Sequence, residues 1–68
     1  MRGISKKLGQ NIKKARAKIK LSQGALAQLL GVDKGYISNI ENAKKNPTIA
    51  TIQKLVEALG VSADELLK

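Results

Sequence analysis

The 68-residue chain contains no cysteine, no histidine, no phenylalanine and no tryptophan. The lack of cysteine excludes disulfides and thiolate metal sites, and the lack of histidine removes the commonest metal ligand and the commonest general base. Five acidic residues are too few to suggest a nucleophile–base pair or a metal cluster. The sequence therefore predicts neither an enzyme nor a protein that binds a metal or a cofactor.

Long apolar runs are absent as well. No segment approaches the roughly 20 apolar residues of a membrane-spanning helix, and the N-terminal sequence MRGISKKLGQ lacks the apolar stretch of a signal peptide. We therefore expect a cytoplasmic protein. The 68 residues are expected to form a single domain, 1–68. A domain of this size buries only about 60% of the surface that its unfolded chain exposes.

Acidic residues are missing from the first half of the chain. Residues 1–32 hold eight basic residues and no acid, whereas residues 33–68 hold five lysines and five acids, so the formal net charge of +8 arises entirely in the first part. Such a field attracts polyanions over a long range. The alternative is a lysine-rich surface that serves only solubility. The basic residues of the first part are Arg2, Lys6, Lys7, Lys13, Lys14, Arg16, Lys18 and Lys20.

Apolar residues recur at helical spacing in five segments, and no segment shows the clean alternation of a β-strand. The sequence therefore predicts an all-α fold. The helices are expected at about 4–18, 22–30, 34–42, 48–59 and 62–67. Their inner faces are expected to carry Ile4, Leu8, Ile12, Ala15 and Ile19; Ala25, Leu26, Leu29 and Leu30; Ile37 and Ile40; and Ile49, Ile52, Leu55, Val56 and Leu59.

Capping residues mark the ends of these helices. Serine, threonine and aspartate accept hydrogen bonds from the free amides of a first turn, and glycine ends a helix in the left-handed conformation. The predicted N-caps are Ser22, Asp33, Thr48 and Ser62, the last in a capping box with Glu65, and the terminating glycines are Gly31 and Gly60.

The second and third predicted helices are separated by only three residues, 31–33. Two helices joined by so short a glycine-containing turn form a helix-turn-helix. At about 100° per residue, Ile37 and Ile40 define the buried side of the third helix. The opposite side is small and polar, as a helix that enters a groove about 12 Å wide requires. It carries Gly35, Ser38, Asn39 and Asn42, with Lys34 beside them.

Gly35 stands in the first turn of this helix, where glycine costs roughly 0.5–1 kcal/mol relative to alanine. We interpret it as a position that lets the start of the helix approach DNA closely. The alternative is that Gly35 is merely tolerated because tertiary packing overrides helix propensity.

The segments LSQ, LAQLLGV, YISNIEN and NPTIATIQKLVEALGVSADEL occur in the order and spacing of one family. On these segments the chain resembles the helix-turn-helix domain of the Cro and phage-repressor type, the Xre family, over about residues 8–67. The resemblance implies a compact five-helix, lambda-repressor-like fold and a sequence-specific transcriptional regulator that binds double-stranded DNA. Its recognition helix, about 34–42, would lie in the major groove.

In the resembled family the first turns of the recognition helix read the bases. Lys34 suits guanine, and Asn39 suits adenine or the DNA backbone. Asp33 is either a helix cap or a reader of cytosine, and Tyr36 either packs at the helix edge or contacts a phosphate. The expected DNA-binding residues are Gln23, Lys34, Gly35, Tyr36, Ser38, Asn39, Asn42, Lys44, Lys45 and Asn46.

The resemblance also implies an ion pair between Arg16 and Glu41. By angle Glu41 falls near the buried side of the third helix, where an acid needs a partner; the alternative is an exposed pair worth under about 1 kcal/mol. The chain departs from the family at Lys20 and Ala43, which stand where glycine often ends the first and third helices. We expect Asn42 to take the left-handed conformation in place of Ala43.

Family members usually bind palindromic DNA as two-fold dimers. The interface expected here is the C-terminal part around Val61, Leu66 and Leu67, which would give a weak homodimer, in solution or only on DNA. Two other classes stay open. A basic amphipathic first helix is typical of membrane-surface peptides, but it lacks Trp and Phe. A protein-interaction module such as an antitoxin would keep this fold, although the polar face of the third helix favours DNA.

Overall fold

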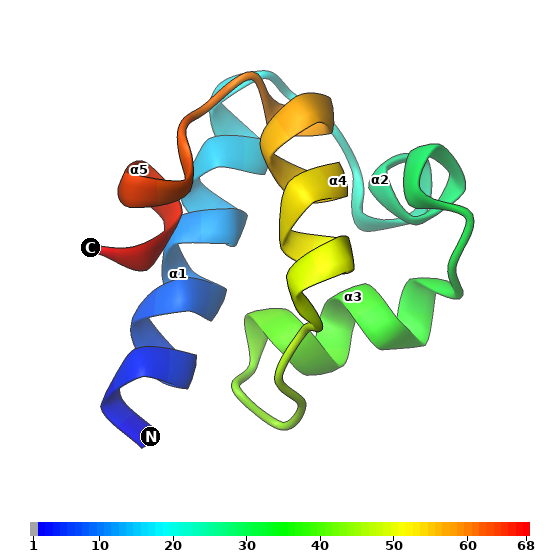
Figure 1. The fold of residues 1–68 in the computed structure, drawn as a ribbon. Coiled ribbons are helices and arrows are strands. Elements are labelled where there is room, and N and C mark those ends of the chain that lie inside the picture. Colours follow the sequence, from blue (N-terminus) through cyan, green and yellow to red (C-terminus); the bar gives the residue numbers. More distant parts are fainter. Residues whose placement is uncertain (1) are drawn as a thin grey trace.

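The computed structural model describes the backbone of residues 2–68 and the side chains of residues 6–68, so the predictions for Arg2 and Ile4 lie outside the described side chains. Five α-helices and no strand occur between residues 2 and 68, which confirms the all-α prediction. In Figure 1, α1 and α4 stand side by side, and α3 lies crosswise below α4 with one end beside the lower half of α1. The helices are α1 (Arg2–Lys18), α2 (Gln23–Leu30), α3 (Lys34–Glu41), α4 (Ile49–Leu59) and α5 (Ala63–Leu67).

Capping side chains begin three of these helices as predicted. The Ser22 hydroxyl accepts from the Ala25 amide at 3.0 Å, and the Thr48 hydroxyl accepts from the Thr51 amide at 3.2 Å. Ser62 and Glu65 form the reciprocal capping box at the start of α5. The glycines at positions 31 and 60 take left-handed φ values of 72° and 68° and end α2 and α4.

The prediction that Asn42 would take the left-handed conformation is wrong. Asn42 has φ −97°, and Ala43 has φ +60°. The Ala43 amide donates to the Ile40 carbonyl and the Lys44 amide donates to the Asn39 carbonyl. The first of these bonds lies inside the second, as at many helix ends, and the pair requires a left-handed residue one position beyond the C-cap. That residue is Ala43, although the conformation costs an L-residue roughly 1–2 kcal/mol.

One apolar core joins all five helices. Each helix turns one apolar stripe inward, and together the five stripes form a single set of buried aliphatic side chains. The buried apolar residues are Leu8, Ile12, Leu26, Ala27, Leu30, Ile37, Ile40, Leu55, Leu59 and Leu66.

Three apolar residues predicted to face inward are exposed instead. Leu29 is 64% exposed because α2 buries Leu26, Ala27 and Leu30, and Leu29 lies about 100° around the helix from Leu30. Ile49 is 78% exposed because it lies about 120° around α4 from Leu55. Ile19 follows the last residue of α1 and leaves that helix's buried stripe.

Leu66 is 1% exposed and belongs to the core, so its predicted role in a dimer interface is wrong. The Asn11 side-chain amide on α1 donates to the Leu66 carbonyl at 2.9 Å, which holds α5 against α1. With this bond in place, the side chain of Leu66 points between the helices, whereas Leu67 remains on the surface.

Gly9 allows α1 to lie directly on the end of α3. A Cβ atom at this position would stand 2.6 Å from the carbonyl oxygens of both Ile40 and Glu41. Both atoms belong to backbone that cannot move away without shifting α3. The hydrogen atom of glycine therefore sets the distance between these two helices.

Arg16 and Glu41 fasten α1 to α3 beside that contact, as predicted. The Arg16 Nε donates to Glu41 Oε2 at 2.7 Å, and its Nη2 donates to Oε1 at 3.1 Å. The third donor, Nη1, binds the Leu21 carbonyl at 2.8 Å. The side chain of Glu41 is only 2% exposed, which excludes the alternative of an exposed pair.

The hydrogen bonds and negative charge of Glu41 raise the pKa of Arg16 above its ordinary value, although burial acts in the opposite direction. The guanidinium therefore keeps its charge and its bidentate geometry, which is the strong form of an ion pair between arginine and a carboxylate.

Replacing Gly9 with alanine is expected to lower the free energy of unfolding by about 1–3 kcal/mol, since the methyl group overpacks a backbone contact. Urea denaturation measures this as a lower midpoint. Gly35→Ala is the matched control, because nothing lies within 4 Å of a Cβ there, and it should raise stability by about 0.5–1 kcal/mol. Equal shifts for the two variants would contradict a close α1–α3 contact.

Glu41→Gln is expected to destabilise the fold towards the lower end of about 3–5 kcal/mol, because it leaves a mostly buried guanidinium without its counter-charge while Arg16 keeps 14% exposure. Thermal unfolding measures the loss. The matched control is Glu57→Gln on the exposed side of α4, which should stay within about 0.5 kcal/mol of the parent chain. A similar loss in both variants would mean that net charge, not the ion pair, is responsible.

Candidate nucleic-acid interface

The outward side of α3 is small, polar and uncovered. Lys34, Gly35 and Asn39 are exposed and Ser38 is half-buried, whereas Ile37 on the other side is buried. A Cβ atom built on Gly35 meets nothing within 4 Å, so this glycine faces away from the core, as predicted. We refer to Lys34, Gly35, Ser38 and Asn39 as the α3 strip.

Asp33 occupies the N-cap position of α3 with extended backbone angles, but its side chain accepts no capping hydrogen bond. The prediction is therefore right for the position and wrong for the bond. The exposed carboxylate borders a shallow hollow between α3 and α4 that Gly31, Val32, Tyr36 and Thr51 also line.

Tyr36 packs at the edge of α3. It is half-buried, and its hydroxyl lies 3.3 Å from the Thr51 hydroxyl on α4. The Lys45 ammonium stands 5.3 Å from the centroid of its ring, within the range of a cation–π contact. Tyr36 therefore links the start of α3 to α4 and keeps one lysine of the following loop beside the α3 strip.

The loop after α3 brings polar and basic residues to the same side. Lys44, Lys45 and Asn46 are all exposed. Asn42 is also exposed, and its side-chain amide donates to the Ser38 carbonyl at 2.9 Å. This bond orients the Asn42 side chain along α3 and leaves its carbonyl oxygen as an acceptor.

Gln23 differs most from its predicted placement. It is half-buried at the start of α2, and its side-chain Nε2 donates to Glu41 Oε1 at 2.9 Å. Glu41 thus receives hydrogen bonds from Arg16 and Gln23 together. This bond orients the Gln23 side chain in the corner between α2 and α3. It uses the side-chain nitrogen and not the carbonyl oxygen.

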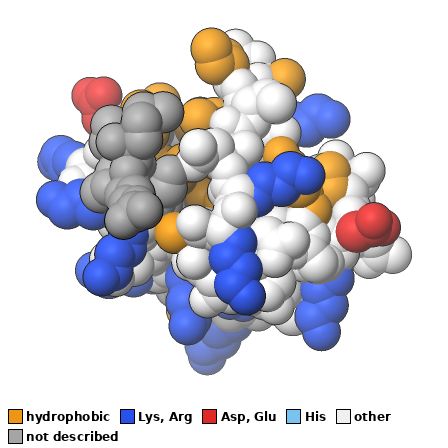
Figure 2. All heavy atoms as spheres, turned by 90° about the horizontal axis from the view of Figure 1, so that it is seen from below, with side chains coloured by type: hydrophobic (Ala, Val, Ile, Leu, Met, Phe, Trp, Pro, Cys, Tyr) orange, Lys and Arg blue, Asp and Glu red, His pale blue; other side chains and the backbone are white. Residues whose placement is uncertain are grey.

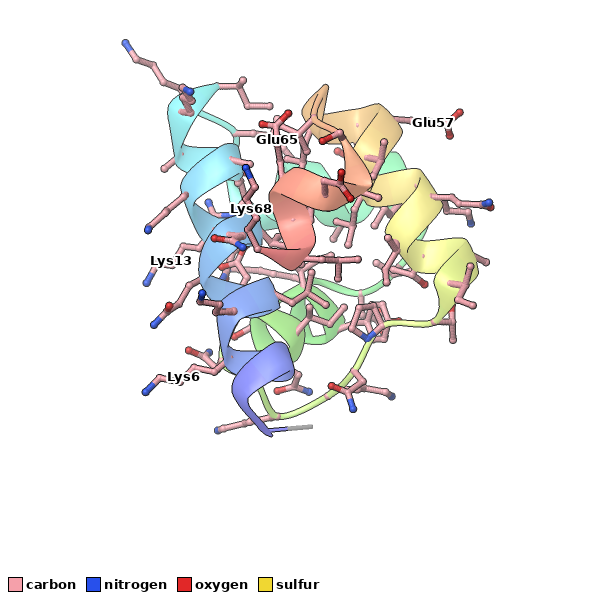
Figure 3. The ribbon with its side chains drawn as sticks, turned by 60° about the vertical axis from the view of Figure 1, so that its left-hand side comes forward. Lys6, Lys13, Glu57, Glu65 and Lys68 are labelled. Atoms are coloured by element: carbon pink, nitrogen blue, oxygen red, sulfur yellow. The ribbon has the colours of Figure 1, made fainter. Side chains whose placement is uncertain are left out.

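Charge is unevenly distributed over the molecule. Figure 2 looks at the molecule from below, and blue Lys and Arg side chains are spread across the visible part of this face, with red side chains only towards its margins. Figure 3 places Lys6 at the lower end of α1 and Glu57 and Glu65 at the upper end of the molecule. Glu57 and Glu65 therefore lie away from the α3 strip.

Two residues that organise this surface escaped sequence reasoning. Gly9 carried a signal, a glycine in the middle of a helix, but its meaning depends on which backbone lies opposite. Thr51 carried none, because its role as the partner of Tyr36 depends on the packing of α4 against α3.

Among residues 2–68 no helix is long and apolar enough to cross a membrane. The described residues also contain no group of three or more His, Cys, Asp or Glu side chains that could hold a metal ion.

Known proteins are similar to this chain in sequence and in fold. The sequence profile of the helix-turn-helix family matches residues 12–66. Control protein C.MunI of Mycoplasma sp is 36% identical over 67 residues, which cover 97% of this chain and 90% of that protein. The crystal structure of the restriction-modification controller protein C.AhdI from Aeromonas hydrophila superposes with a TM-score of 0.85 at 36% identity, covering 90% of this chain and 92% of that one.

The same fold also occurs inside a larger enzyme. Hydroxypropylphosphonic acid epoxidase from S. wedmorenis aligns with 100% of this chain at a TM-score of 0.93 and 25% identity, but the match covers only 36% of that protein. The fold alone therefore does not determine activity. The profile match and the near full-length relative do determine the family: the chain belongs to the helix-turn-helix family and is a DNA-binding transcription regulator.

Proposed function

We propose that α3 lies in the major groove of duplex DNA and reads its sequence through the α3 strip. The observation that carries this proposal is that one side of α3 is exposed and small while the opposite side is fixed in the core by Ile37 and Ile40. Within the strip, Lys34 would donate to guanine O6 and N7, and Asn39 would pair with adenine. Each such contact is worth about 1–3 kcal/mol of discrimination.

Contacts to the DNA backbone are assigned to the residues on either side of the strip. Lys44, Lys45 and Asn46 follow α3 in an exposed loop, and Asn42 is oriented along the helix by Ser38. Gln23 stands at the N-terminus of α2, where free amides favour a phosphate. Tyr36 serves this surface chiefly by holding Lys45 beside the strip, because its own hydroxyl lies against Thr51.

Two copies of the chain are proposed to bind a palindromic site. With Leu66 in the core, the contact is assigned to the exposed apolar residues of α4 and α5, Ile49 and Leu67. The same two helices line a hollow through Ile52, Val56 and Ala63. Val61 is half-buried and contributes only its edge. Because this apolar surface is small, we expect a weak homodimer in solution. Binding of both copies to one palindromic site would stabilise the dimer on DNA.

We infer that this chain has no enzymatic activity, since its sequence holds no cysteine or histidine and only five acids, which suggest no nucleophile–base pair or metal cluster. Two of the near full-length relatives are control or controller proteins, which favours a transcriptional regulator of that kind; we propose that it acts in the cytoplasm on duplex DNA.

Selection of bound sites from a pool of random duplexes tests the proposed function. We expect a consensus with two inverted half-sites about one helical turn apart, which would report base reading and the two-fold dimer together. Binding to the selected site should weaken with salt, with a log–log slope of about −0.9 for each phosphate contacted. Asn39→Ala should relax the preference at one position of each half-site. Recovery of no consensus would refute sequence-specific reading.

Gly35→Ala should stabilise the protein and weaken its binding to the selected duplex, because a methyl group on the α3 strip separates the helix from the base edges or the sugar–phosphate backbone. Titration of a labelled duplex measures the affinity, and the unfolding midpoint measures stability. If the variant becomes more stable and binds equally well, Gly35 is only tolerated and does not provide close approach.

A further inference from the structure

The outer face of α1 carries more positive charge than a duplex seated on α3 would use. Five lysines of this helix are exposed. Among the side chains of residues 6–68, the only ion pair is that of Arg16 with Glu41, so none of these five has an acid within 4.0 Å. The five are Lys6, Lys7, Lys13, Lys14 and Lys18.

These lysines form two rows along the helix. At about 100° per residue, Lys6 and Lys13 follow one line, and Lys7, Lys14 and Lys18 follow a second line. The strip between the rows is neutral and is occupied by Gln10 and Ala17. Figure 3 shows Lys6 and Lys13 projecting from the same side of α1, away from α4 and α5.

The spacing within a row fits a nucleic-acid backbone. Residues seven apart on a helix are separated by about 10 Å, which equals the rise of about three phosphates along one DNA strand. The second row borders a hollow between α1 and α5 in which Glu65 also lies, but that carboxylate is held by Ser62 in the capping box. A backbone lying between the rows would therefore meet lysines on both sides.

A duplex on α3 cannot reach most of this charge. In Figure 1 one end of α3 lies beside the lower half of α1, where Gly9 and Arg16 make the contacts with α3. At about 100° per residue, the second row lies about 140–180° around α1 from these two residues, so it points away from α3. Lys13 lies only about 40–60° from them, on the side of α1 that borders α3.

The chemistry of this face favours DNA over other polyanionic partners. A membrane-surface helix needs an apolar face, but Leu8 and Ile12 of α1 are buried in the core. A protein interface normally has a Trp, Tyr or Arg anchor, and Arg16 points inward to Glu41. What this face offers is lysines on both sides of a small neutral strip. Lysine binds phosphate as a point charge, which suits the backbone of DNA.

We propose that the outer face of α1 is a second phosphate-binding surface, which holds the backbone of a second DNA duplex irrespective of its sequence. This inference rests on the proposed binding of a first duplex by α3. With two surfaces directed differently, one chain can join two separate segments of DNA.

The test uses the full chain on an immobilised duplex that carries its selected site, with unbound protein washed away. A labelled random-sequence duplex is then added over a range of salt concentrations. The parent chain should capture it, and K14Q/K18Q should make the salt slope of capture shallower by about 1.8, because two phosphate contacts of the row that points away from α3 are lost. The control K54Q/K68Q removes the same charge from exposed positions outside α1 and should leave capture unchanged.

Retention on the immobilised duplex reports the α3 surface, and capture of the labelled duplex reports α1, so the two proposals can fail separately. Three results would overturn the α1 surface. The parent chain captures no second duplex; K14Q/K18Q captures it as the parent does, as expected if a second copy's α3 holds it; or K14Q/K18Q loses both duplexes in parallel.

Discussion

The orientation of α3 depends on one carboxylate buried inside a strongly basic protein. Glu41 lies at the last residue of α3 and receives hydrogen bonds from Arg16 on α1 and Gln23 on α2. A buried charge is tolerated only when it is paired and hydrogen-bonded. The relative orientation of the three helices is therefore restricted to arrangements that keep these hydrogen bonds. The helix that carries the candidate reading surface is therefore fixed at its C-terminal end by polar contacts and along its length by Ile37 and Ile40.

Two glycines have different structural roles in this chain. Gly9 lies against carbonyl oxygens at the end of α3, and its missing side chain creates a contact between helices. Gly35 faces open space on the other side of α3, and its missing side chain leaves room for something outside the protein. Both weaken the helices that contain them, but only the first returns stability through packing.

Much of the candidate site could be predicted from the sequence, because it lies on one regular helix. Periodicity places Gly35 and Asn39 opposite Ile37 and Ile40, and the structure agrees. Side chains at the corners could not be predicted in this way. Gln23 hydrogen-bonds inward to Glu41, Asp33 forms no capping bond, and Tyr36 lies against Thr51, since each of these depends on how a neighbouring helix packs.

The sequence by itself determined the five helices, their caps at Ser22, Thr48 and Ser62, and the concentration of positive charge in the first 32 residues, because these follow from local spacing and composition. Tertiary structure decided which apolar residues are buried. Leu66 enters the core while Leu29 and Ile49 stay outside, although all three fit an apolar helical stripe. Periodicity defines a face only to within about one residue on either side, and the helix packed against that face selects the residues it covers.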